Sequence, residues 1–196
     1  DSGKAFILIS EGDNSIILDP GSNDQLTPED VERISGRLVE CAGVLVQHEI
    51  PMSVVNKTIE ICKGKTPIFL NPAPAARLEK SILGGIDYFI CNEIECEFYT
   101  GIRPVEAAEI YQALARLESL GILHPVITLG SKGVAYLKGQ AGVIKSAYHV
   151  NVLDSTAAGD TFVGAFAAMI CTGADIDMAA DMAQAAAALT CTRVGA

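Results

Sequence analysis

The stretch LDSTAAGDTFVGAF, residues 153–166, places two acids on either side of a run of small residues and then continues as a helical pattern. If the helix begins near Gly159, the N–H groups of Ala157, Ala158 and Gly159 are free at its positive end. Small side chains let a ligand approach this backbone, so the stretch predicts an anion site. Asp160 would then lie in the first turn, where a carboxylate can accept a proton from an attacking hydroxyl. The alternative is that this acid only favours the helix start.

The rest of the chain alternates short apolar runs with stretches of helical spacing. This alternation predicts βαβ units, and therefore an α/β fold with a mainly parallel sheet between helices. Such sheets bind ligands beyond the carboxyl ends of their strands, where this chain has loops at 47–49, 71–74, 92–95 and 130–133. A further helix is expected to begin at Thr27, its N-cap. We expect strands at 43–47, 67–70, 88–91, 126–129 and 134–137, and helices at 51–63, 93–99, 105–120, 159–171 and 178–191.

The first residues of the chain predict a separate small element. Two β-prone apolar runs, 6–10 and 15–18, are separated by Glu11-Gly12-Asp13-Asn14, whose residue types are typical of a turn. This pattern predicts a β-hairpin.

Composition limits the classes of function. The chain has 196 residues, of which 49% are hydrophobic, enough for one sizeable core and one domain. A net charge of −10 argues against nucleic acid as a partner, but a metal ion and helix N-termini can still hold a single nucleotide. The apolar runs are too short to span a membrane, and no signal peptide is apparent. Six cysteines without a C-x-x-C spacing argue against zinc and predict buried, reduced thiols in a cytoplasmic protein.

Several well-known motifs are absent. The chain has no G-x-x-x-x-G-K-[ST] and no G-x-G-x-x-G, which argues against a P-loop protein and against a Rossmann-type oxidoreductase. It also lacks H-E-x-x-H and G-x-S-x-G.

Five motifs, in order, resemble the ribokinase (PfkB) family of carbohydrate kinases. DSTAAGDTFVGAF is similar to the family signature DT-x-[GA]-AGD-x-F-x-[GA], and it is accompanied by NPAPA, CNEIE, ITLGSKGV and AAAALTCTRVGA. The resemblance covers essentially the whole chain. It implies a three-layer α/β/α sandwich with a small β-hairpin lid, in one partial domain, 1–196, to whose lid residues 3–23 contribute. The family's N-terminal sugar-binding motif and last helix have no match, so we expect a fragment or an incompletely recorded chain.

The resemblance assigns chemistry to the opening stretch. Asp160 matches the base that takes the proton from the sugar's primary hydroxyl. Ala157, Ala158 and Gly159 match the anion hole that stabilises the transferring γ-phosphoryl group. Phosphoryl transfer depends mainly on positioning and charge stabilisation, which agrees with the interpretation from the residues alone.

Two ion sites are implied by the same resemblance. Asn92 and Glu95 match the family motif N-x-x-E, in which Asn92 faces the nucleotide and Glu95 holds Mg²⁺, directly or through water. The alternative is a capping box, formed by an N-cap Asn and a Glu three residues later. A monovalent-cation site for K⁺ would use Asp154 and backbone oxygens of the C-terminal segment; the alternative for Asp154 is a turn residue. The K⁺ residues are Asp154, Thr156, Thr190, Arg193 and Gly195.

Further residues are assigned to substrates. Glu49 matches an acid that binds sugar hydroxyls, with a solvated loop acid as the alternative. The resemblance places Gly130, Lys132 and Gly133 in a nucleotide-binding loop. The alternative for the two glycines is a plain hairpin turn, and the alternative for Lys132 is a solvated turn residue. His48, His124 and His149 match no catalytic position, so they are expected in loops or on the surface. The residues implied for ATP, besides Asn92, are Thr128, Leu129, Gly130, Ser131, Lys132, Gly133 and Gln184.

The resemblance therefore implies an ATP-dependent sugar kinase that acts on the primary hydroxyl of D-ribose, with Mg²⁺ and K⁺. It also implies a cytoplasmic homodimer joined through the lid, with neither nucleic acid nor a membrane as partner. The alternatives are another kinase of the family, specific for fructose, a ketodeoxygluconate-type sugar or a nucleoside, and a non-catalytic module that binds nucleotide or sugar.

Overall fold

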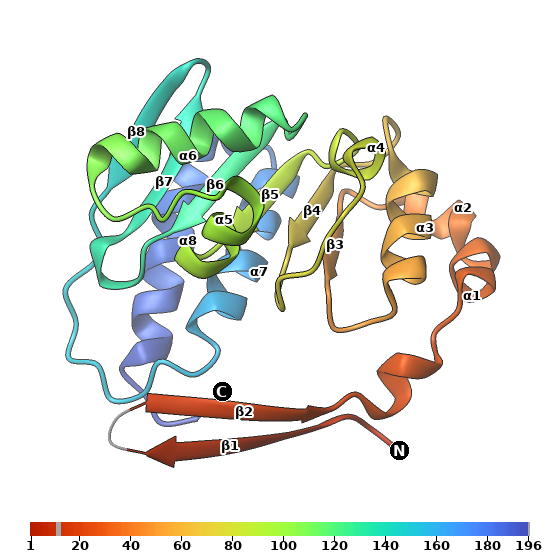
Figure 1. Ribbon diagram of the computed structural model, residues 1–196, viewed down its shortest axis with the longest axis horizontal. Coiled ribbons are helices and arrows are strands. Elements are labelled where there is room, and N and C mark those ends of the chain that lie inside the picture. Colours follow the sequence, from red (N-terminus) through yellow and green to blue (C-terminus); the bar gives the residue numbers. More distant parts are fainter. Residues whose placement is uncertain (11–12, 196) are drawn as a thin grey trace.

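A six-stranded sheet forms the centre of the computed structural model, which describes residues 1–10 and 13–195 (Figure 1). The strands lie in the order of the sequence, β3-β4-β5-β6-β7-β8. Pairing is parallel from β3 to β6, whereas β7 and β8 are antiparallel additions at one edge. The mainly parallel sheet is thus confirmed. The strands are β3 (Val44–Gln47), β4 (Ile68–Asn71), β5 (Tyr88–Cys91), β6 (His124–Thr128), β7 (Val134–Lys138) and β8 (Ala141–Lys145).

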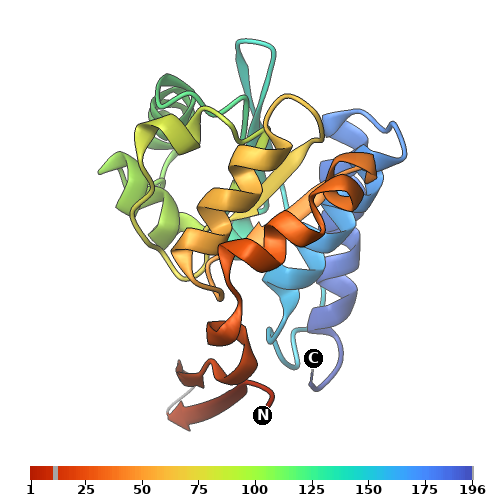
Figure 2. The same cartoon turned by 90° about the vertical axis from the view of Figure 1, so that its right-hand side faces the viewer.

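Helices cover both faces of this sheet, as Figure 2 shows. Alternate residues of a strand point to opposite faces, so Phe69 of β4 packs against α7 and α8 while Ile68 and Leu70 face α3 to α6. The three layers predicted from the sequence are therefore present. The helices are α1 (Pro28–Arg33), α2 (Ser35–Glu40), α3 (Met52–Cys62), α4 (Lys80–Leu83), α5 (Glu93–Thr100), α6 (Ala107–Ser119), α7 (Ala158–Cys171) and α8 (Ile176–Cys191), with 3₁₀ helices η1 (Gly21–Gln25) and η2 (Gly130–Lys132).

Some helices begin or end at other residues than predicted. Thr27 is the N-cap of α1, as the sequence predicts, and it forms a capping box with Asp30, but the helix breaks at Ile34 before α2 begins. Helix α8 begins two residues earlier than predicted because the Asp175 side chain accepts the N–H of Met178 at 2.8 Å. Strand β8 and the short helix α4 have no predicted counterpart.

The N-terminal strands form a two-stranded sheet apart from the main sheet (Figure 1). Strands β1 (Lys4–Ser10) and β2 (Asp13–Asp19) pair in antiparallel register, which confirms the predicted hairpin. Asp13 and Asn14 belong to β2 and not to the turn, because the ladder extends to the pair Ser10 and Asp13. Glu11 and Gly12, the other half of the predicted turn, lie outside the described residues.

A polar cluster fastens α8 to the antiparallel edge of the sheet. Tyr136 of β7 donates its hydroxyl to Asp177 at 2.5 Å, and Lys138 forms an ion pair with the same carboxylate. The backbone oxygen of Asp177 accepts from Lys145 of β8 at 2.9 Å. The Lys138 ammonium and the Tyr136 hydroxyl lower the pKa of Asp177 below its ordinary value.

Replacing this carboxylate is expected to destabilise the fold in a pH-dependent way. A carboxylate whose pKa is lowered by folding stabilises the native state above its unfolded pKa, about 3.9, and this contribution is lost as the pH falls. Asp177→Asn should therefore lower the melting temperature at pH 7, and the deficit should shrink below pH 4. Thermal unfolding across this range measures it. Asp181→Asn, one turn later with only a 3.4 Å ion pair to Lys145, is the control, and equal deficits at both sites would contradict the prediction.

Candidate active site

Helix α7 begins at the carboxyl edge of the parallel strands with an unusual backbone conformation. Its N-cap, Ala157, has φ +60°, the only positive φ of a non-glycine residue in the described part of the chain. The helix begins at Ala158, one residue before the predicted start, and the N–H of Ala158 donates to the carbonyl of Ser155 at 3.2 Å. Within residues 1–10 and 13–195, nothing accepts the N–H groups of Ala157 and Gly159. These two groups, rather than all three predicted ones, remain as donors for an anion.

The left-handed conformation of Ala157 gives a stability prediction. An L-residue in this region carries a strain of roughly 1–2 kcal/mol that glycine does not carry, although glycine costs more entropy on folding. Ala157→Gly is therefore expected to raise the free energy of unfolding by about 0.5–1 kcal/mol, measured by urea denaturation. Gly159→Ala, in open space on the helix, is the comparison substitution of the same size. A clear loss of stability in Ala157→Gly would show that the strain is not present.

A cavity of about 470 Å³ opens at the start of α7, between the end of β6, α8 and the loop that precedes α7. Its lining contains most residues predicted to bind the nucleotide and part of the predicted anion hole. Gly130 and Gly133 line it from the turn between the antiparallel strands β6 and β7, so they form both the turn and the cavity wall. The predicted residues in the lining are Asn92, Thr128, Gly130, Ser131, Gly133, Ala158, Gly159 and Gln184.

Two residues predicted to bind the nucleotide have other surroundings. Leu129 is buried in the hydrophobic core on the α3–α6 face, because it follows the inward alternation of β6. Lys132 donates to the backbone oxygen of Val105 at 2.9 Å and is absent from the lining, so its ammonium is directed elsewhere. The side chains of both residues therefore lie outside the cavity lining, and only their backbone belongs to the turn beside it.

Gln184 of α8 is the most informative residue of the cavity. It is buried, with 6% of its surface exposed, and lines the cavity. Among the described residues, neither its side-chain nitrogen nor its side-chain oxygen has a hydrogen-bond partner. Buried amides are normally paired, so this amide leaves a donor and an acceptor available to whatever occupies the cavity.

The sequence did not reveal the loop and helix residues that complete the cavity. Tyr148, His149, Val150 and Val152 come from the loop after β8, and their signal is only an apolar segment before the signature. Sequence spacing does not place this segment opposite α8, since only the folded sheet brings the two together. The other unpredicted residues of the lining are Glu93, Ala147, Ser155, Phe162, Ala187, Ala188 and Cys191.

Asn92 and Glu95 form a complete capping box at the start of α5. The Asn92 side-chain oxygen accepts from Ile94 N and Glu95 N, each at 2.9 Å. The Glu95 carboxylate accepts from Asn92 N at 2.9 Å and from Asn92 Nδ2 at 3.1 Å. Burial raises the pKa of Glu95, and the hydrogen bonds from Asn92 oppose this rise. The capping box, which was the alternative for this pair, is therefore present. Each oxygen of the Glu95 carboxylate still has a free lone pair.

The loop before α7 is tied to the end of α8 around Asp154. Asp154 accepts from Thr156 N at 2.9 Å, from Thr156 Oγ1 at 2.7 Å and from Gly195 N at 3.0 Å, and these bonds lower its pKa. Of the predicted K⁺ residues, the structure brings these three together. Of the predicted backbone oxygens, that of Thr190 accepts from the N–H of Arg193 at 3.1 Å. Within the described residues, no group of three or more His, Cys, Asp or Glu side chains could hold a metal ion.

Asp160 is not part of the cavity lining and is directed toward the ends of β3 and β4. Its Oδ1 accepts from Gln47 Nε2 at 3.1 Å, and the same nitrogen donates to Asn71 Oδ1 at 3.1 Å. Glu49 follows two residues after Gln47 and is exposed. Gln47 and Asn71 are the last residues of β3 and β4, where two of the loops that the sequence singled out were expected, but no role was predicted for either.

The histidines follow the prediction in two of three cases. His48 lies in the loop after β3, as predicted, although it is buried, and its Nδ1 lies 3.1 Å from the carbonyl of Pro74. His124 lies in β6 and stacks on Tyr88 with ring centroids 4.7 Å apart. Burial lowers the pKa of both histidines. Only His149 is in an exposed loop, as predicted.

The cysteines are free, as predicted, but not all are buried. Cys62, Cys91 and Cys96 are in the core, whereas Cys41 is exposed. No helix in the described part of the chain has the length and hydropathy needed to cross a membrane.

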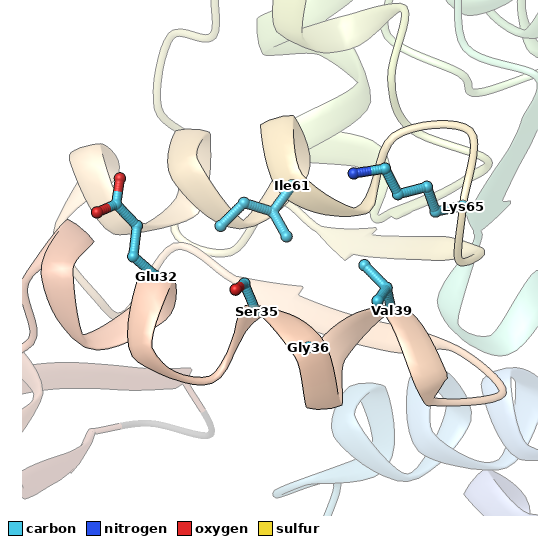
Figure 3. Close-up of a pocket in the computed structure, with 6 residues that line it drawn as sticks. All are labelled: Glu32, Ser35, Gly36, Val39, Ile61 and Lys65. Carbon is cyan, nitrogen blue, oxygen red and sulfur yellow. The ribbon is translucent and has the colours of Figure 1, made fainter.

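A second hollow of about 370 Å³ lies between α2 and α3 (Figure 3). Ile61 of α3 faces Ser35 and Val39 of α2, with Glu32 and Lys65 at the two ends. No residue predicted for the site lines this groove.

A cavity at the carboxyl edge of a mainly parallel sheet, beside free N–H groups at a helix start, is the arrangement in which α/β proteins bind anionic ligands. The family model described as "pfkB family carbohydrate kinase" matches residues 1–196. The chain belongs to this family of carbohydrate kinases.

Individual relatives agree with this assignment. The chain is 36% identical over 199 residues to a ribokinase of Staphylococcus aureus, and 35% identical over 198 residues to a deoxyribokinase of Salmonella typhi. These matches cover 100% and 99% of the chain, but only 65% and 64% of the relatives. The structure of Arabidopsis thaliana ribokinase complexed with ribose and ATP superposes with a TM-score of 0.87 at 31% identity, covering 99% of this chain and 64% of that one. The chain thus spans somewhat less than two thirds of the length of these relatives.

Proposed function

We propose that this chain provides the nucleotide site and the catalytic base of an ATP-dependent sugar kinase that phosphorylates the primary hydroxyl of D-ribose. The observation that carries the proposal is the position of Asp160 at the start of α7. The preceding residues Ala158 and Gly159 line the cavity, whereas Asp160 faces the ends of β3 and β4. A base at this boundary is placed between a nucleotide on one side and a sugar on the other. The relatives named ribokinase support the choice of sugar.

The proposed reaction follows from this placement. Asp160 takes the proton of the primary hydroxyl as that oxygen attacks the γ-phosphorus, and the bond from phosphorus to the β–γ bridging oxygen breaks, releasing ADP. The N–H groups of Ala157 and Gly159 stabilise the charge on the transferring group. Glu49, exposed after β3, is proposed to accept hydrogen bonds from sugar hydroxyls.

The cavity is the proposed ATP site. The unpaired amide of Gln184 supports this, because a nucleobase edge presents donors and acceptors side by side. Gly130 and Gly133 lack side chains and permit close approach of the nucleotide. For Leu129 and Lys132, only contacts of the backbone with the nucleotide are proposed. Asn92, Thr128 and Ser131 also line the cavity and are proposed to contact the nucleotide.

Two cations are proposed to accompany ATP. Mg²⁺ neutralises phosphate charge when bound, and the free lone pairs of the Glu95 carboxylate, beside the cavity-lining Asn92, fit a magnesium ion held through water. Oxygen atoms from Asp154, Thr156 and the segment 190–195 fit the preference of K⁺ for hard oxygen ligands. The hydrogen bonds that hold this loop against the end of α8 support that assignment.

We also propose one domain, 1–196, with residues 3–23 as its lid, which acts as a homodimer in the cytoplasm. Phe6 and Ile17 are directly paired across the hairpin and are 56% and 58% exposed, so the lid offers an apolar surface to a second copy. Six free cysteines support a reducing compartment. Light scattering measures the molar mass, and a monomer at micromolar concentration would contradict the dimer.

The test of the proposed function is ADP release from MgATP, with and without K⁺, across D-ribose, 2-deoxy-D-ribose, D-fructose, ketodeoxygluconate and nucleosides. Release that depends on D-ribose and is enhanced by K⁺ is the expected result. Preference for another sugar would assign another kinase of the family. Binding of ATP without release in the presence of any sugar would favour a non-catalytic module.

A further inference from the structure

A chain of hydrogen bonds crosses the carboxyl ends of three neighbouring strands and ends at Asp160. Asn71 Nδ2 donates to the backbone oxygen of Ile90 in β5 at 2.9 Å. Gln47 Nε2 donates to Asn71 Oδ1 and to Asp160 Oδ1, each at 3.1 Å. Gln47 and Asn71 are paired in the parallel register of β3 and β4, so both side chains leave the sheet at the same level.

The chemistry of the groups determines the direction of this chain. A backbone carbonyl only accepts, so Asn71 must present its NH₂ group to Ile90 and its oxygen to Gln47. Gln47 must then present its own NH₂ group to Asn71, and the second hydrogen of that group is left for Asp160. The backbone of β5 therefore decides the orientation of both amides, and Asp160 receives a donor and not an acceptor.

We propose that Gln47 and Asn71 are positioning residues for Asp160, an inference that rests on the proposed function. Asp160 is exposed, and an exposed carboxylate without a tether samples several rotamers. One oxygen is held by Gln47, so the other is kept for the proton of the sugar hydroxyl. A general base must lie within about 3 Å of that proton, and small misplacements cost up to about 100-fold in rate. Neither amide touches the reacting atoms in this arrangement.

Steady-state kinetics distinguish positioning from sugar binding. Gln47→Met keeps the length of the side chain and removes the donor, and should lower kcat about 10- to 100-fold. The KM values for sugar and MgATP should remain within about threefold of wild type. Asn71→Leu should lower kcat about tenfold, and the double variant should lose no more than Gln47→Met alone, because both act through one chain. A higher sugar KM at unchanged kcat, or additive losses, would overturn the proposal. Gln112→Met, on the exposed face of α6, is the matched control.

A second measurement needs no turnover. The side-chain amide resonance of Gln47 in a ¹⁵N–¹H spectrum should shift in Asp160→Ala and in Asn71→Leu, while that of Gln112 stays in place. A Gln47 resonance that ignores Asp160→Ala would overturn the positioning role, whatever the activity. If wild type phosphorylates no sugar, the proposed function fails, while the response of the Gln47 resonance still decides whether this amide holds Asp160.

Discussion

Asp160→Asn is expected to lower the sugar-dependent kcat by about 10²- to 10⁴-fold while leaving the fold and nucleotide binding intact. General-base catalysis contributes about this factor, and an amide cannot take the proton of the sugar hydroxyl. Its side-chain oxygen can still accept from Gln47, so the substitution removes basicity and retains the contact seen in the structure. The remaining rate would come from the N–H groups of α7 and from alignment of the two substrates.

Coupled assay of ADP release gives kcat, and titration with MgATP gives the affinity. We expect the affinity to stay within about threefold of wild type, because Asp160 is outside the cavity lining. Asp181→Asn on α8 removes the same charge at an exposed position and should retain full activity. A kcat for Asp160→Asn within threefold of wild type would assign the proton to another acceptor.

The sequence predicts best those features that local chemistry determines. The short apolar runs of β3 to β7 and the Thr27 cap appear as expected, because a buried strand and a capped helix leave a pattern within a few residues. Strand β8 has no such pattern: its first residue is exposed and the following four are all half-buried, at the sheet edge. It is recognised only through its pairing with β7.

In the candidate site too, features that depend on neighbouring residues could be predicted, and features that depend on tertiary contacts could not. The free N–H groups at the start of α7 could be predicted because a helix start and small residues are adjacent in the chain. Gln47 could not be assigned, because its partners Asn71 and Asp160 come from distant segments that only the parallel register brings together. The direction of the Lys132 side chain could not be predicted either, since its contact with the carbonyl of Val105 depends on tertiary packing and has no sequence signal.

Gly133→Ala is expected to destabilise the protein by about 3 kcal/mol and to weaken nucleotide binding at least tenfold. Gly133 has φ +114° and ψ −131°, a region that side chains other than hydrogen rarely enter, at a cost of about 1–3 kcal/mol. A Cβ at this position would overlap the backbone oxygen of Lys145 and lie 2.7 Å from the backbone nitrogen of Ala147. Relief of this overlap must move Ala147, which lines the cavity together with Gly133, so stability and binding should be lost together.

Gly130→Ala is the control that measures the cost of the left-handed backbone without the atomic overlap expected at Gly133. Gly130 lies three residues earlier in the same turn, with φ +54° and no atom within 4 Å of the added Cβ. It should therefore cost only the left-handed strain, about 1 kcal/mol, and lose less nucleotide affinity than Gly133→Ala, because the loop that carries Ala147 does not have to move. Urea denaturation and MgATP titration of both variants give the comparison. Equal losses at the two glycines would mean that the loop after β8 does not pack against Gly133, and the cavity would then lack the wall that this loop provides.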